Sequence, residues 1–194
     1  MSALDGKVLL FVGPDGSGRF TLAKAIGVTL QIPMVISYTT RPKRPNETEG
    51  TDYHFVSEEQ FKKMQENGEF IEAVQADGFY YGIRQEDCQK LLDQAGSFFA
   101  VLSPEGCEIF KKIFKETLTI FIYADRETVT QRQIERRDDP ATIERHLKHY
   151  DEIMKYKDKC DISIPNYDLA STAQELTRRI EEFLGITHHP DSKY

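Results

Sequence analysis

The chain has 194 residues, of which 39% are hydrophobic, and its 32 acidic and 25 basic side chains give a formal net charge of −7. This length suits a single domain with one sizeable core and room for an inserted lobe. The acidic balance argues against a nucleic-acid polymer as partner, because no excess of cationic side chains exists to release its counterions. A small anion held by a few neighbouring arginines is compatible with this charge.

The N-terminal apolar run is short and opens into a glycine-rich turn, so we interpret "KVLLFVG" as a buried strand and not as a targeting segment. No apolar run reaches membrane-spanning length, and we expect a cytoplasmic protein without a membrane partner. Cys88, Cys107 and Cys160 are odd in number and widely spaced, which favours reduced structural thiols over disulfides or a zinc site. No residue is assigned as a metal ligand.

The first elements in chain order are a strand, a glycine loop and a helix. Residues 7–12 are a strand candidate that is continuously apolar after Lys7, which is typical of a strand buried on both faces, and residues 21–30 follow with helical spacing. From residue 34 to about 82 the chain is rich in Thr, Pro and charge, and we interpret this part as a lobe inserted between core strands. Inside it, Ser57 and Gln60 have the spacing of a capping box and predict the start of a helix.

The second half alternates strands with helices. Residues 97–102 and 118–124 are two more apolar strand candidates, and the segment between them has a helical pattern. This alternation predicts a parallel sheet covered by helices on both faces. A long charged helical stretch follows, broken at Pro140, then a late strand and an amphipathic helix that ends near Gly185. The last residues are polar, and we expect them to be frayed.

The glycine loop between the first strand and helix predicts a phosphate site. Gly13, Gly16 and Gly18 allow the backbone to curl around an anion, with its N–H groups pointing inward at the positive end of the helix. The order of strand, loop and helix favours phosphate binding over a turn that binds nothing. We assign the phosphate loop to Gly13, Gly16, Ser17, Gly18, Arg19, Phe20 and Thr21.

Two positions of this loop depart from the strong form of the motif, which has Lys followed by Ser or Thr. Arg19 conserves the positive charge of the lysine but not its compact geometry. Phe20 replaces a hydroxyl that serves as a magnesium ligand, and a phenyl ring cannot coordinate a metal. Thr21 is adjacent, but it points about 100 degrees away around a helix and does not simply restore the ligand.

A second signature lies in the inserted lobe, where "ISYTTRPKRPNETEGTDYHFV" is followed by "GEFIEA" and "YYG". The guanylate kinase family, whose members transfer the γ-phosphoryl group of ATP to GMP, has a similar pattern: S-x-T-T-R-x-x-R-x-G-E-x-x-G-x-D-Y-x-F, then G-x-F-[IL]-E, then Y-Y-G-[TS]. Together with the glycine loop, this chain resembles that family along nearly its whole length. The matching residues are Ser37, Thr39, Thr40, Arg41, Arg44, Glu47, Gly50, Asp52, Tyr53, Phe55, Glu72, Tyr80, Tyr81 and Gly82.

The resemblance implies an α/β fold of the P-loop NTPase type. Its parallel sheet core would be covered by helices and would carry an inserted lobe that binds the nucleoside monophosphate, together with a helical lid. Residues 1–194 would form one domain. Its parts would be a core of about residues 1–33, 96–125 and 158–185, a lobe of about 34–95, a lid of about 126–157 and a tail of 186–194.

The same resemblance implies a GMP-binding site made of Ser37, Arg41, Arg44, Tyr53, Glu72 and Tyr81. The arginines and tyrosines would clamp the phosphate, since a guanidinium can grip a phosphate through two parallel hydrogen bonds. The Glu72 carboxylate, which only accepts hydrogen bonds, would favour the guanine edge over adenine. Taken singly, the arginines also fit a solvated basic loop, and the tyrosines also fit packing at the lobe interface.

The resemblance implies four catalytic arginines: Arg19, Arg132, Arg136 and Arg145. The last three would belong to the lid and stabilise the charge of the transferring group, although a charged helical surface is the alternative. Ile83 stands where family members have Ser or Thr, and Ser103 stands where they have an aspartate that serves guanine and magnesium. Together with Phe20, these are the degenerate positions of the site.

We therefore hypothesise a guanylate kinase-like protein that binds a purine mononucleotide, in the first place GMP, and whose phosphoryl transfer from ATP is weak or lost. One alternative is a working guanylate kinase with Arg19 in place of the lysine. Another is a protein-interaction module in which the former nucleotide cleft accepts a peptide partner. ATP and Mg²⁺ are expected if the protein is active, and no cofactor is expected otherwise.

Overall fold

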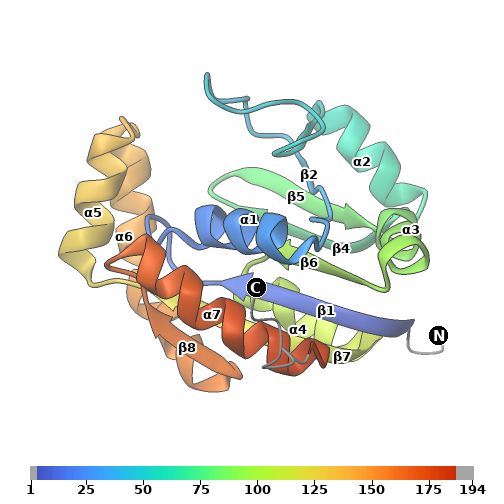
Figure 1. The fold of residues 1–194 in the computed structure, drawn as a ribbon. Coiled ribbons are helices and arrows are strands. Elements are labelled where there is room, and N and C mark those ends of the chain that lie inside the picture. The colour runs from blue at the N-terminus through green and yellow to red at the C-terminus, as the bar shows by residue number, and fades with distance from the viewer. Residues whose placement is uncertain (1–3, 187–194) are drawn as a thin grey trace.

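The structure of this protein is a computed structural model that describes residues 4–186. A parallel four-stranded sheet with the strand order β6-β1-β7-β8 lies at its centre (Figure 1). The strands are β1 (Leu4–Val12), β6 (Ser97–Val101), β7 (Phe114–Tyr123) and β8 (Ile162–Pro165). Leu9 of β1 pairs with Phe99 of β6 and with Leu118 of β7, which sets the register of three neighbouring strands.

Helices cover both faces of this sheet, as the sequence predicts. The four that pack on it are α1 (Arg19–Leu30), α3 (Gln85–Ala95), α4 (Pro104–Ile113) and α7 (Leu169–Leu184). Leu9 and Phe11 of β1 pack with side chains of α1 and α7, whereas Val8 and Leu10 pack with side chains of α3 and α4. Because successive strand residues face opposite sides, burial on both faces explains why residues 8–12 of β1 are all apolar.

The inserted lobe contains a second sheet with the order β3-β2-β5-β4, which lies above the core in Figure 1. Its elements are β2 (Tyr38–Thr39), β3 (His54–Phe55), α2 (Glu58–Glu66), β4 (Phe70–Ala76) and β5 (Phe79–Arg84). The predicted capping box is confirmed, because the Ser57 hydroxyl accepts from the Gln60 N–H and the Gln60 side chain accepts from the Ser57 N–H. The Phe61 ring stacks on Phe70 and Tyr80, which joins α2 to the sheet.

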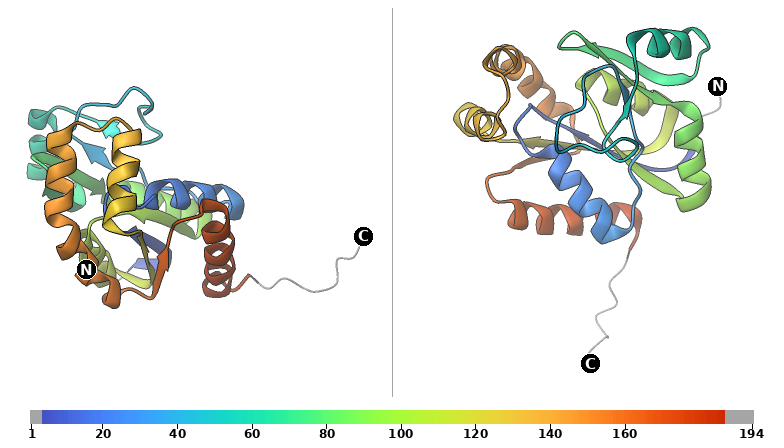
Figure 2. Two further views of the ribbon diagram at one scale, coloured as in Figure 1. Left: turned by 90° about the vertical axis from the view of Figure 1, so that its left-hand side faces the viewer. Right: turned by 90° about the horizontal axis from the view of Figure 1, so that it is seen from above.

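Two helices, α5 (Arg126–Glu135) and α6 (Pro140–Met154), lie side by side next to the core, and the 3-10 helix η1 (Lys155–Lys159) follows (Figure 2). The chain breaks before Pro140, as predicted, and Pro140 takes the first position of α6. The Asp139 carboxylate caps this helix by accepting from the N–H groups of Ala141 and Thr142, at 3.2 and 2.9 Å.

Some boundaries differ from the sequence prediction. β7 begins at Phe114 instead of residue 118, because Phe114 is buried and pairs with Leu4 of β1. α1 begins at Arg19, two residues before the predicted start, so Arg19 and Phe20 belong to its first turn. The tail from Thr187, which we expect to be frayed, lies outside the described residues.

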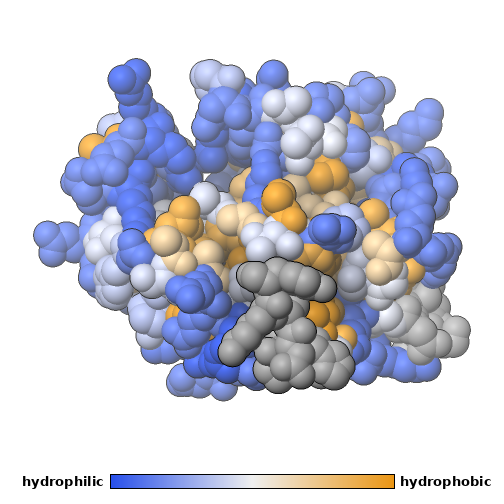
Figure 3. All heavy atoms as spheres, in the orientation of Figure 1, coloured by the Kyte–Doolittle hydropathy of each residue, from blue (hydrophilic) through white to orange (hydrophobic). Residues whose placement is uncertain are grey.

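The surface and the cysteines agree with a compact core. Hydrophilic side chains cover the lobe and the lid on the face shown in Figure 3, while apolar side chains gather around α1 in the middle of that face. The three cysteines are free, and Cys88 and Cys107 are buried. Within residues 4–186, no helix is both long enough and apolar enough to cross a membrane.

Candidate functional site

A cavity of about 810 Å³ lies between the glycine loop, the lobe, helix α6 and the segment 136–139 that joins α5 to α6. It reaches the carboxyl ends of β1 and β6, the edge of a parallel sheet at which open α/β folds bind their ligands. The residues assigned from the sequence that line it come from the loop, the lobe, the lid and, for Ser103, the start of α4. They are Gly13, Arg19, Ser37, Arg41, Arg44, Tyr53, Glu72, Tyr81, Ser103, Arg136 and Arg145.

The glycine loop has a backbone that other residues would strain. Gly13, Gly16 and Gly18 have φ angles of +152°, +83° and +83°. A Cβ on Gly13 would lie 1.9 Å from the Ile122 carbonyl oxygen, and one on Gly18 would lie 2.5 Å from Nδ2 of Asn166. The loop thus packs closely on its surroundings and leads into α1, whose first N–H groups have no partner within the helix.

Arg19 places its guanidinium over this loop. Its Nη1 donates to the Gly13 carbonyl oxygen, and its Nη2 lies 3.5 Å from Oδ1 of Asp15. Burial acts to raise the pKa of Asp15, but the charges of Arg19 and His146 hold it below its ordinary value. Asp15 is therefore an anion inside a loop that is suited to anions, and it takes up part of the positive charge of Arg19.

Arg132 does not line the cavity and instead supports the glycine loop through backbone carbonyl groups. Its Nη2 donates to the Asn166 carbonyl oxygen at 2.8 Å, and its Nη1 lies 3.4 Å from the carbonyl oxygens of Gly16 and Ser17. Nδ2 of Asn166 donates to the same Ser17 oxygen at 2.8 Å. These donors hold the loop carbonyls in place, and the sequence does not single out Asn166 for this role.

The side chains of Phe20 and Thr21 do not line the cavity. The Phe20 ring stacks on the Tyr53 ring, with centroids 6.1 Å apart and planes inclined by 10°. The Thr21 side chain is exposed. The Ser17 hydroxyl is fully buried and has no hydrogen-bond partner among the described residues.

These positions decide whether the protein can hold a magnesium ion on the donor side of the cavity, where the glycine loop would bind ATP. Phe20 provides no oxygen, and the Ser103 hydroxyl accepts from the Gly106 N–H at 3.1 Å as the N-cap of α4. The Asp15 carboxylate is paired with Arg19. The residues present therefore do not fit a magnesium ion anchored by the protein, and an ion that arrives with ATP would depend on phosphate and water oxygens.

The predicted phosphate clamp of the lobe is organised by Glu47. Its carboxylate accepts two parallel hydrogen bonds from Arg41, at 2.7 and 3.0 Å, and one from the Arg44 N–H at 2.8 Å. Burial acts to raise the pKa of Glu47, but the hydrogen bonds from Arg41 and Arg44 hold it below its ordinary value. Glu47 belongs to the matched motif but not to the assigned site. Its place three residues after Arg44 is the signal for its orienting role.

The two clamp tyrosines meet beside these arginines. The rings of Tyr53 and Tyr81 are arranged edge to face, with centroids 6.2 Å apart, and the Arg41 guanidinium lies 5.3 Å from the Tyr53 centroid. Burial raises the pKa of both phenols. Both therefore stay protonated at neutral pH and can donate a hydrogen bond to an anion.

Glu72 lies at the opposite end of the clamp, on β4, with only 5% of its surface exposed. Burial and then repulsion by Glu105 raise its pKa to about 7. Glu105 lines the same cavity from the first turn of α4. A Cβ on Gly106 would lie 2.9 Å from Oε1 of Glu72, so this glycine leaves room for the carboxylate.

The degenerate positions Ile83 and Ser103 have structural roles. Ile83 is fully buried in the core cluster that includes Val8 and Leu10 of β1. Ser103 starts α4 with its side chain. Neither residue places a charge beside Glu72, which leaves Glu105 as its acidic neighbour.

The lid arginines differ in how they are held. Arg136 forms a bidentate pair with Asp138, through Nε at 3.0 Å and a shorter contact from Nη2. Arg145 donates to the Thr142 hydroxyl at 2.8 Å, and its Nε lies 3.9 Å from Oδ1 of Asp77. Both arginines line the cavity, so the structure brings them to the face on which Arg19 and Arg41 lie.

His146 connects the lid to the lobe and was not identified from the sequence. Its Nε2 lies 3.0 Å from Oδ2 of Asp77, at the turn between β4 and β5, and 4.0 Å from Oδ2 of Asp15. Its Nδ1 lies 2.6 Å from Oε1 of Gln133, whose amide nitrogen is directed at the carbonyl oxygens of Val129 and Asp15. Both ring nitrogens thus face acceptors, which favours the doubly protonated ring.

The pKa of His146 follows from this arrangement. Burial acts to lower it, but the hydrogen bond to Asp77 and the charges of Asp15, Asp77 and Asp138 raise it above its ordinary value. No pattern in the sequence connects His146 to a turn 69 residues away.

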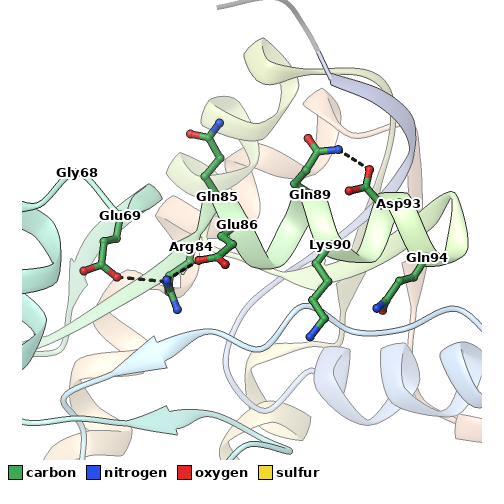
Figure 4. Close-up of a pocket in the computed structure, with 9 residues that line it drawn as sticks. All are labelled: Gly68, Glu69, Arg84, Gln85, Glu86, Gln89, Lys90, Asp93 and Gln94. Atoms are coloured by element: carbon green, nitrogen blue, oxygen red, sulfur yellow. Dashed lines mark hydrogen bonds and ion pairs between the residues drawn. The ribbon is translucent and has the colours of Figure 1, made fainter.

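A second hollow, of about 700 Å³, lies along the outer side of α3 (Figure 4). Its walls are polar side chains such as Gln89 and Lys90, and Arg84 pairs there with Glu69 and Glu86 at 3.2 and 2.7 Å. None of the residues assigned to the site from the sequence lines this hollow. The candidate site is therefore the larger cavity.

Known proteins resemble this chain over nearly its whole length. Residues 5–183 match the protein family described as guanylate kinase. A guanylate kinase of Pseudomonas fluorescens (strain Pf0-1) is 30% identical over 179 residues, covering 91% of this chain and 87% of that protein. One of Nitrosococcus oceani is 31% identical over 181 residues, covering 88% and 89%. The crystal structure of guanylate kinase from Anaplasma phagocytophilum has a TM-score of 0.75 and 26% identity, and covers 94% of this chain and 88% of its own.

Proposed function

Because the chain belongs to the guanylate kinase family, we propose that it binds GMP and transfers the γ-phosphoryl group of ATP to it only slowly. The observation that carries this proposal is the asymmetry of the cavity. All the residues predicted to bind GMP line its acceptor side, namely Ser37, Arg41, Arg44, Tyr53, Glu72 and Tyr81. Its donor side has Phe20 in place of the metal-binding hydroxyl, with the phenyl ring stacked on Tyr53.

On the acceptor side, each group has a chemical task. Arg41 and Arg44, oriented by Glu47, would hold the dianionic phosphate, and the phenols of Tyr53 and Tyr81 would add donors. The Glu72 carboxylate would accept hydrogen bonds from the guanine edge. Because adenine presents a different pattern of donors and acceptors there, this carboxylate favours guanine.

On the donor side, the protein acts mainly through position and charge, since phosphoryl transfer leaves little covalent work to its residues. The loop N–H groups and Arg19 would hold the triphosphate, and Arg136 and Arg145 would offset the charge that spreads over the transferring group. The lid would also exclude water once it is held to the lobe through His146 and Asp77. Loss of the metal-binding hydroxyl at Phe20 should lower the rate on the order of 10²-fold.

A second reading, a guanylate kinase of ordinary activity, is favoured by the position of Arg19. Its guanidinium reaches the Gly13 carbonyl at the mouth of the loop, where it can neutralise phosphate charge. In that reading, the magnesium ion would be held by the nucleotide and by water. This reading predicts turnover in the range of ordinary enzymes, about 1–10³ s⁻¹.

Titration calorimetry with GMP, AMP, ATP and ADP, each with and without Mg²⁺, tests the proposal. GMP should bind more tightly than AMP. Mg²⁺ should increase the affinity for ATP only slightly, because the protein supplies no ligand to the ion. A parent protein without measurable GMP affinity would contradict the acceptor half of the proposal. A large gain in ATP affinity with Mg²⁺ would contradict the donor half.

A further inference from the structure

Phe20 makes its main ring contact with the acceptor side of the site. It is the second residue of α1, yet its ring stacks on Tyr53, which lies in the segment just before β3. The Tyr53 ring in turn contacts Phe55 and Tyr81, at centroid distances of 5.8 and 6.2 Å. Phe20 is thus the contribution of the core to a ring cluster that otherwise belongs to the lobe.

A second contact, one helical turn further along α1, joins the same two parts. Nζ of Lys24 lies 2.9 Å from Oδ1 of Asp52, and it also lies 5.3 Å from the centroid of the Phe20 ring. The other oxygen of Asp52 accepts from the Thr48 N–H at 2.7 Å. Since positions i and i+4 of a helix share a face, Phe20 and Lys24 together hold the segment 48–53 against α1.

We propose that Phe20 is a positioning residue for the acceptor substrate: it holds Tyr53, and with it the phosphate clamp, in the binding arrangement before GMP arrives. The inference rests on the proposed function, because it needs Tyr53 to contact the phosphate of GMP. A clamp that is already ordered loses less freedom on binding, and its affinity is higher for that reason. Phenylalanine at position 20 therefore supplies no metal ligand on the donor side, but it increases the affinity of the acceptor side for GMP.

This role predicts a separation of kinetic effects that a purely structural residue would not produce. Phe20→Ser should raise the KM for GMP because it releases the clamp, and it should raise kcat because it restores a hydroxyl at the metal position. Phe20→Leu, which keeps an apolar side chain but no ring, should raise only the KM for GMP. Phe20→Tyr, which keeps the ring, should leave that KM unchanged.

Calorimetry with GMP and hydrogen exchange of residues 48–55 test the proposal. We expect Phe20→Leu to weaken GMP binding about fivefold to tenfold, as the loss of one aromatic pair predicts, and to speed amide exchange in 48–55 until GMP is added. Phe20→Tyr should match the parent in both measurements. Val28→Ala, at a residue of the same helix that is 81% exposed, is the matched control and should change neither.

The outcomes separate this inference from the proposed function. A parent that binds GMP, together with a Phe20→Leu variant that binds it equally well and exchanges at the same rate, would overturn the inference alone. A parent without GMP affinity would overturn the proposed function and this inference with it. If Phe20→Leu does not fold, Phe20→Tyr and Lys24→Met test the proposal instead. Because Phe20→Tyr keeps the ring stack, a loss of GMP affinity in Phe20→Tyr as large as the loss in Lys24→Met would overturn the proposal.

Discussion

The raised pKa of Glu72 predicts how both the stability of the protein and its affinity for GMP change with pH. The side chain is 5% exposed, and its pKa rises from 4.5 to about 7, by burial first and then by the charge of Glu105. Between these two values the folded protein holds a proton that the unfolded chain has released, so stability falls as the pH rises from about 4.5 through about 7. Since one pKa unit corresponds to about 1.4 kcal/mol, the ionised carboxylate costs the folded state about 3 kcal/mol at pH 8.5.

Glu72→Gln removes this titration with little change in size. Urea denaturation at several pH values should show a variant as stable as the parent near pH 4.5 and more stable by about 3 kcal/mol at pH 8.5. Stability curves of the parent and Glu72→Gln that run parallel over this range would refute the reasoning.

The same titration should appear in GMP binding. About a tenth of Glu72 is ionised at pH 6 and about nine-tenths at pH 8, so the affinity for GMP should rise about tenfold between them if guanine binds the carboxylate. A phosphate monoester ionises near pH 6 and contributes in the same direction. The ratio of parent to Glu72→Gln affinity removes that contribution, and a ratio that does not change with pH would contradict the assignment of Glu72 to guanine.

Three further predictions concern the clamp, the lid and a cap. Arg44→Ala should weaken GMP binding, and less so as salt is raised, whereas equal loss at all salt concentrations would argue against a phosphate contact. Asp77→Asn should lower the pKa of His146, measured by NMR, and should lower the free energy of unfolding by about 1 kcal/mol below about pH 6.5. Because the protonated ring makes the contact, this loss of stability should fade as the pH rises through the raised pKa of His146, and a loss that persists at high pH would refute this origin. Ser103→Ala should lower stability by about 1 kcal/mol through loss of the α4 cap, and an unchanged urea midpoint would show that the cap contributes nothing.

The family and the fold class could be predicted from the sequence, and both are confirmed. The reason is that local patterns encode them: residues 8–12 of β1 are all apolar because both faces of the strand are covered there, and Pro140 ends one helical stretch and begins the next. The clamp motif has a fixed spacing because its residues follow one another along a single lobe. The assignment of residues 34–95 to the lobe and 126–157 to the lid stays a prediction.

The contacts between distant segments could not be predicted. His146 meets Asp77, and Phe20 meets Tyr53, only because the lid and α1 each lie against the lobe in the folded chain. The sequence marks Phe20 as a lost metal ligand but contains no sign of its ring partner. Similarly, the position of Arg132 among the lid arginines suggests a catalytic role, whereas its contacts are with loop carbonyls that no local pattern identifies. The catalytic role of Arg19, Arg136 and Arg145 stays a prediction.

Steady-state formation of GDP from ATP, Mg²⁺ and GMP, measured for the parent and for the double variant Arg19→Lys/Phe20→Ser, tests the impaired donor side most directly. We expect kcat of the double variant to exceed that of the parent at least tenfold, with a higher KM for GMP. Equal kcat values, with the parent turning over at an ordinary rate, would show that Arg19 and Phe20 form a competent donor site and would contradict the proposed slow transfer.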